Sequence, residues 1–175
     1  AYAGDIIGIY NHWQLHIGDT LTEGEKLGFT GIPYFAPELF RSARARDPLK
    51  GKQLHQGLKE LGEEGAIQVF EGEFGDLMLG AVGQLQFEIV AQRLATEYKV
   101  DAIYEACDVA TARWLVFPDE KTKKEFCDEQ SNRLARDSEG NLCYMATSVY
   151  NLMTTQKHWP QVEFRTTREQ GQKFE

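Results

Sequence analysis

Strand-like and helix-like patterns alternate along most of this 175-residue chain, and their order limits the folds open to it. Residues 36–46 have an extended character and end at Asp47-Pro48. That pair favours a helix start, because Asp caps free amides and Pro suits the first helical turn. Leucines then recur at the spacing of one helix face: Leu54, Leu58 and Leu61. The sequence therefore predicts a strand followed directly by an amphipathic helix.

The next segments extend this order to a complete unit. Residues 66–70 and 77–79 flank a turn rich in Gly and Glu, which is typical of a hairpin. Residues 84–98 carry apolar side chains at helical spacing, and residues 101–105 read as a closing strand. The order βαββαβ predicts an α+β fold of the ferredoxin-like kind, with two helices on one face of a four-stranded sheet.

The remaining residues repeat that order with weaker signals. Trp114 and Val116 alternate with Arg113 and Leu115 as a strand, and Phe126 is one of few apolar residues in a polar helix. The predicted elements are strands at 112–116, 133–136, 142–147 and 162–166, and helices at 119–130 and 148–158. We therefore expect a second βαββαβ-like element packed on the first.

The first thirty residues have a different character. Asp5–Tyr10 is β-rich, and Trp13, Leu15 and Ile17 alternate with polar residues at the period of a strand. A few strands without further partners do not form a stable sheet. We expect them to be the end of a truncated β-barrel whose beginning lies upstream of Ala1.

Composition excludes several classes of protein. Lys and Arg number 19 against 27 Asp and Glu, so the net charge is −8, and 42% of residues are apolar, as in globular domains. No apolar run reaches the about 18 residues of a membrane span, and the start shows no secretory signal pattern. Cys107, Cys127 and Cys143 form no CxxC pair, which favours free thiols in a reducing cytoplasm.

No catalytic, cofactor or metal motif stands out in the sequence. The phosphate-binding Gly-x-x-x-x-Gly-Lys-Ser/Thr loop does not occur. Gly80–Gly83 leads from strand to helix and favours a tight connection over an anion site. His12 and His16 favour a barrel surface over a metal site. For a cysteine nucleophile, the remaining histidine partners are His55 and His158.

Basic residues gather at the predicted strand–helix corner. They are Arg41, Arg44, Arg46, Lys50 and Lys52, against Asp47 as the one acid in 41–52. Such a group suits phosphate oxygens, and each neutralised phosphate adds salt-dependent affinity. A solvated charged edge that discourages sheet aggregation is an equal alternative. Because the whole chain is acidic, any contact with nucleic acid must be local.

Several motifs resemble one family of translation factors. Ala3–Gly8 and Ile17–Leu21 are similar to the end of the β-barrel second domain of translational GTPases. Phe29–Phe40, with the sequence FTGIPYFAPELF, closely resembles the barrel-to-tail junction of the bacterial release factor 3 family. Gly80–Glu88, Val109–Trp114 and Val162–Glu169 are also similar to that family, so the resemblance covers essentially the whole chain.

The resemblance implies a division of the chain and a function. Residues 1–30 would be the end of domain II, and residues 31–175 would be domain III, which lies against the small ribosomal subunit. The family's GTPase removes class I release factors from the ribosome after peptide release, in the cytoplasm. Its GTP or GDP and Mg²⁺ belong to a GTPase domain upstream, so we expect neither catalysis nor a cofactor in this fragment.

Two functions from different classes follow. The first is a ribosome-docking module without catalysis of its own, in which the five basic residues are candidate contacts by charge alone. The second is a small-molecule enzyme on a ferredoxin-like scaffold, which requires a deep pocket where titratable groups converge.

Overall fold

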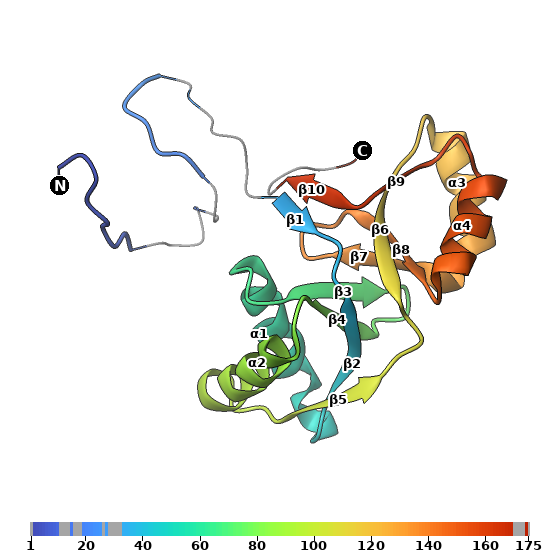
Figure 1. Cartoon of the computed structure of the whole chain (residues 1–175). Helices are drawn as coiled ribbons and strands as arrows, with labels where there is room; N and C mark the ends of the chain where they lie inside the picture. The colour runs from blue at the N-terminus through green and yellow to red at the C-terminus, as the bar shows by residue number, and fades with distance from the viewer. Residues whose placement is uncertain are drawn as a thin grey trace.

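The computed structural model describes residues 2–10, 15, 19–25, 27, 33–169 and 174, and most of them form two βαββαβ units (Figure 1). The first unit consists of β2 (Leu39–Ala45), the 3-10 turn η1 (Pro48–Lys50), α1 (Gly51–Glu63), β3 (Gln68–Gly72), β4 (Leu77–Ala81), α2 (Gln84–Glu97) and β5 (Ala102–Ala106). The second consists of β6 (Thr111–Val116), α3 (Glu120–Gln130), the 3-10 turn η2 (Ser131–Arg133), β7 (Leu134–Asp137), β8 (Leu142–Ala146), α4 (Val149–His158) and β9 (Glu163–Arg165).

All of these strands belong to one antiparallel sheet. Its order is β5-β2-β4-β3-β7-β8-β6-β9, so that each unit has its fourth strand beside its first and its third strand between the first and second. The two units meet where β3 pairs with β7, with Phe70 opposite Asp137 and Gly72 opposite Ala135. The repeated βαββαβ order predicted from the sequence is confirmed.

The first unit folds around the predicted leucine stripe. Asp47 accepts a hydrogen bond from the Leu49 backbone amide at 3.0 Å, which caps the turn that leads into α1. Leu58 is fully buried and packs in one cluster with Val69 and Leu79 of the hairpin. The helix α2 contributes Phe87, Val90 and Leu94 to the same cluster. This packing confirms the two predicted helices and the common face of the hairpin.

The second unit is centred on one aromatic ring. Phe126 of α3 is fully buried and makes edge-on contacts with Tyr144, Trp159 and Phe164 at centroid distances of 6.1, 5.2 and 5.9 Å. Such contacts add to the free energy gained by burying apolar area. A single phenylalanine therefore anchors a helix that is otherwise polar.

A third apolar cluster lies on the face of the sheet opposite the helices. Phe70 of β3 and Trp114 of β6 belong to it, whereas their neighbours Val69 and Leu115 belong to the clusters under the helices. Adjacent strand residues point to opposite faces, so these strands are buried on both sides. Figure 1 accordingly shows α1 and α2 on one outer side of the molecule and α3 and α4 on the other, with the strands between them.

The predicted barrel strands are not observed. Within the described residues 2–10 there is no strand, and the side chains of Ile6 and Tyr10 are exposed. Asp5–Tyr10 therefore does not form the expected strand here: its β propensity meets no neighbouring strand among the described residues. Trp13 and Ile17, on which the second predicted strand depended, lie outside the described residues.

A small second sheet was not predicted. β1 (Pro33–Phe35) pairs antiparallel with β10 (Thr167–Glu169), which follows β9 after a bend at Thr166. The predicted final strand at 162–166 corresponds to β9 (Glu163–Arg165), and β10 lies beyond it. This pairing brings the beginning and the end of the described domain together (Figure 1).

A buried ion pair fixes β10 against the second unit. Arg168 Nε lies 2.8 Å from Asp137 Oδ2, with side-chain exposures of 4% and 5%, and Arg168 Nη1 donates to Glu139 at 2.7 Å. Asp137 also accepts a hydrogen bond from Trp114 Nε1 at 3.0 Å. The guanidinium lies over the ring of Tyr34, 4.5 Å from its centroid. These partners compensate for burying both charges.

We expect Leu54→Asp to destabilise the domain by several kcal/mol, because it places an unpaired carboxylate in the core. Leu54 is 3% exposed. The matched control is Leu49→Asp, since Leu49 lies five residues earlier and is 90% exposed. Thermal melting followed by circular dichroism checks this; equal transitions for the two variants would show that the helix face is misassigned.

Removing one partner of the buried pair should also be costly. Asp137→Asn removes the buried carboxylate beside Arg168 and leaves the guanidinium with the more exposed Glu139, so we expect a loss of about 3–5 kcal/mol in the free energy of unfolding. Urea denaturation measures it. Asp108→Asn is the control, because Asp108 also pairs with an arginine but its side chain is 82% exposed. Similar losses in both variants would contradict the role given to burial.

Candidate interaction surface

Five basic residues lie on the segment from β2 into α1 and on the loop that leads into the neighbouring strand β5, and we call this group the basic corner. Its members are Arg44, Arg46, Lys50, Lys52 and Lys99. The Asp47 cap turns the chain from strand to helix within a few residues, which keeps the lysines of η1 and α1 next to the end of β2. The backbone amide of Arg46 donates to the carbonyl of Asp101 at 2.9 Å, which ties the end of β2 to the segment just before β5.

One predicted contact residue is already engaged within the chain. Arg44 donates from Nε and Nη2 to Glu105 Oε1 at 2.9 and 2.7 Å, across the β2–β5 pair. The hydrogen bond and the charge of Glu105 raise the pKa of Arg44, and the same pair lowers the pKa of Glu105. Both side chains are about half exposed, so the pair is open to solvent and to a competing anion.

Arg41 is separated from the rest of the predicted group. It lies opposite Leu79 of β4, and it shares the parity of the buried Ala43, so it belongs to the sheet face that α1 and α2 cover. Arg44 and Arg46 have the opposite parity. The structure therefore places Arg41 on the opposite face of β2 from Arg44 and Arg46, while Lys50 and Lys52 follow on η1 and α1.

Lys99 was missed by sequence reasoning. It follows α2 in the left-handed backbone region, at φ 57°, and its carbonyl accepts a hydrogen bond from Lys50 Nζ at 2.6 Å. No local pattern links two residues that far apart; only the pairing of β5 with β2 brings them together. Beside them Leu49 is 90% exposed, which adds an apolar tip to the cationic surface.

In the loop Gly80–Gly83, the two backbone amides just before α2 are not free to bind an anion. The amides of Val82 and Gly83 both donate to Gln86 Oε1, at 2.8 and 3.3 Å. The second unit repeats this device, because the Thr147 amide donates to Asn151 Oδ1 at 3.3 Å before α4. This supports the predicted tight connection and reveals a residue-level repeat that the sequence alone did not show.

Two of the cysteines and the two described histidines lie in surroundings that do not favour a reactive thiol–imidazole pair. Cys143 is fully buried, and burial raises the pKa of its thiol well above the usual value; burial likewise raises the pKa of Cys127. A nucleophilic thiol requires the opposite shift. His55 faces Glu71 at 3.3 Å, and His158 faces Glu129 at 3.9 Å.

The described part of the chain offers neither a metal site nor a membrane-spanning helix. His12 and His16 lie outside the described residues. Among the residues that the structure does describe, no group of three His, Cys, Asp or Glu side chains is arranged to hold a metal ion. In the same part of the chain, every helix is too short or too polar to cross a bilayer.

The alternative of a small-molecule enzyme depends on a pocket with convergent reactive groups. A cavity of about 680 Å³ lies beside β7 and is lined by Cys127, Asp128 and Arg136 among others. Its thiol has a raised pKa, and His55 and His158 face carboxylates instead. The cavity therefore does not offer the activated nucleophile that the enzyme hypothesis needs.

The fold and these surfaces define a two-unit α+β domain with an exposed basic segment between β2 and α1. Residues 29–156 match the family model described as Class II release factor RF3, C-terminal domain. The chain is also 68% identical over 172 residues to peptide chain release factor 3 of Aromatoleum aromaticum, an alignment that covers 98% of this chain and 31% of that protein. The chain therefore belongs to the release factor 3 family of translation termination, which confirms the resemblance found in its motifs.

Proposed function

We propose that this chain is the ribosome-docking tail of a GTPase that removes class I release factors from the ribosome after peptide release. Family membership supports the place in termination. The observation that carries the docking role is the placement of Arg44, Arg46, Lys50, Lys52 and Lys99 on the β2–α1 segment and the adjoining loop before β5. The partner is ribosomal RNA on the small-subunit side, in the cytoplasm.

The chain spans about a third of the length of the curated relative that it matches, so its part in the reaction is mechanical. Residues 1–30 are assigned to the end of a β-barrel domain II, and residues 31–175 to domain III. By resemblance to the family, GTP or GDP and Mg²⁺ bind a GTPase domain upstream in the full-length protein; the phosphate-binding loop motif does not occur in this sequence. A stiff sheet then keeps its position on the ribosome while the nucleotide state changes the angle between domains.

The electrostatics favour a local contact with phosphate. Arg46 and Lys52 have no ion-pair partner among the described residues, so their charges are available to a ligand. Salt screens exposed charges beyond about 10 Å at 0.1 M, so the acidic remainder of the chain weakens the attraction only modestly. Leu49 next to Lys50 is also exposed, so this surface offers an apolar contact in addition to the charges that bind phosphate.

Charge reversal at this corner should weaken binding to ribosomes. For Arg46→Glu/Lys52→Glu we expect at least a tenfold loss of affinity for small ribosomal subunits, because two phosphate contacts are lost and two repulsions arise. The dependence on salt should also become shallower, by about one to two in the slope of log affinity against log salt. Co-sedimentation of the purified chain with subunits at several salt concentrations measures both quantities.

The control changes the net charge by the same amount at another place. Lys121→Glu/Lys124→Glu alters exposed lysines of α3 in the second unit and should leave the affinity close to that of the unmodified chain. If both double variants lose affinity equally, net charge and not the basic corner governs binding. If neither does, the docking surface lies elsewhere.

A further inference from the structure

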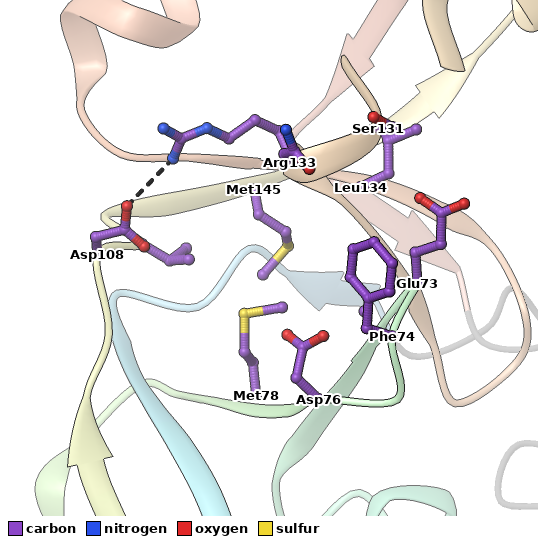
Figure 2. Close-up of a pocket in the computed structure, with 12 residues that line it drawn as sticks. Glu73, Phe74, Asp76, Met78, Asp108, Ser131, Arg133, Leu134 and Met145 are labelled. Atoms are coloured by element: carbon purple, nitrogen blue, oxygen red, sulfur yellow. Dashed lines mark hydrogen bonds and ion pairs between the residues drawn. The ribbon is translucent and has the colours of Figure 1, made fainter. Parts of the chain in front are cut away.

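A small cavity lies where the two units meet, and we call it the junction cavity (Figure 2). Its volume is about 240 Å³. The turn between β3 and β4 forms one wall, and the connection from β5 to β6 together with η2 and the start of β7 forms the others. Neither unit alone contains the whole lining, so the cavity is a product of the β3–β7 joint.

The floor of the junction cavity is apolar and adaptable. Met78 of β4 and Met145 of β8 point toward one another from the two units, and Leu134 of β7 completes the lining beside them (Figure 2). Methionine side chains are flexible and polarisable, so they adjust to the shape of an inserted group. Such a floor suits an aliphatic or planar side chain.

The rim of the cavity is acidic. Glu73 and Asp76 come from the β3–β4 turn, and Asp108 comes from the opposite wall. Asp108 is paired with Arg133 at 3.4 Å, whereas Glu73 and Asp76 have no ion-pair partner among the described residues. Three carboxylates against one guanidinium leave an excess of negative charge at the opening. That excess disfavours a phosphate and favours a cation.

The tip of the same turn presents an exposed ring. Phe74 is 86% exposed and stands between the two turn carboxylates in sequence. An aromatic face beside carboxylates is a good surface for a guanidinium, which stacks on rings and hydrogen-bonds to carboxylates in one plane. The ring and the carboxylates therefore favour arginine over a compact ammonium group.

The volume determines what kind of ligand fits. Pockets for small molecules run from about 300 to 1,000 Å³, so 240 Å³ is a site for one side chain. We propose that the junction cavity receives an arginine side chain presented by a protein partner, with the aliphatic stem against the methionines and the guanidinium against Glu73, Asp76 and Phe74. This inference is independent of the basic corner, which faces a ligand of opposite charge.

Methionine methyl NMR tests the proposal directly, because the chain has three methionines and two of them line the cavity. Met153 of α4 is half exposed on a helix of the second unit and serves as an internal reference. The chain labelled at its methionine methyl carbons is titrated with acetyl-Gly-Arg-Gly-amide and with the same peptide carrying uncharged citrulline. The resonances are assigned with Met78→Leu and Met145→Leu.

We expect the arginine peptide to shift Met78 and Met145 saturably, to leave Met153 in place, and to bind at least tenfold more tightly than the citrulline peptide. Glu73→Gln/Asp76→Asn should abolish that preference, while Glu88→Gln/Asp101→Asn, which removes exposed carboxylates elsewhere, should keep it. Equal binding of both peptides, shifts of all three methyls, or no shift at all would overturn the proposal. Shifts of the two cavity methyls by an oligouridine would overturn it in favour of RNA.

Discussion

The pairing of β3 with β7 is the constraint on which the rest of the structure depends. It joins two four-stranded units into one sheet, and it removes two edges that would otherwise expose unpaired backbone groups. At its end Asp137 lies opposite Phe70, buried among apolar side chains. The carboxylate is tolerated there because Trp114 and Arg168 supply a hydrogen bond and an opposite charge. The same ion pair then holds β10, and through β10 the strand β1.

Sequence reasoning succeeded where the signal is local. The Asp47 cap, the Leu54–Leu58–Leu61 stripe and the hairpin at β3–β4 depend on neighbours within a few residues, and the structure has each of them. It failed where a strand requires a distant partner. Asp5–Tyr10 has the composition of a strand but no partner strand among the described residues. In contrast, β1 and β10 pair with each other although the paired residues lie more than 130 positions apart in the sequence. Pairing, and not propensity, decided these cases.

The candidate site shows the same boundary between local and distant information. Charge density along residues 41–52 could be read from the sequence, and it pointed to the basic corner. The alternation of side chains along β2 already separates Arg41 from Arg44, but only the structure shows that the helices cover the face of Arg41. Lys99 joins the basic corner through the pairing of β5 with β2. The junction cavity is wholly a product of tertiary structure, since Met78 and Met145 meet only after β3 and β7 have paired.

Segregation of charge makes the proposed contact with a polyanionic particle compatible with a net charge of −8. The cations gather beside β2 and β5 at one end of the strand order, and the carboxylates of the junction cavity lie at its middle, near β3 and β7. Screening acts over about 10 Å, so each surface presents its own sign to a ligand in contact with it. Two surfaces of opposite sign on one stiff sheet fix an orientation as well as an affinity, because a partner of mixed chemistry fits in one direction only. A domain held in one orientation can convert a change in the angle between itself and an upstream domain into a movement in one direction.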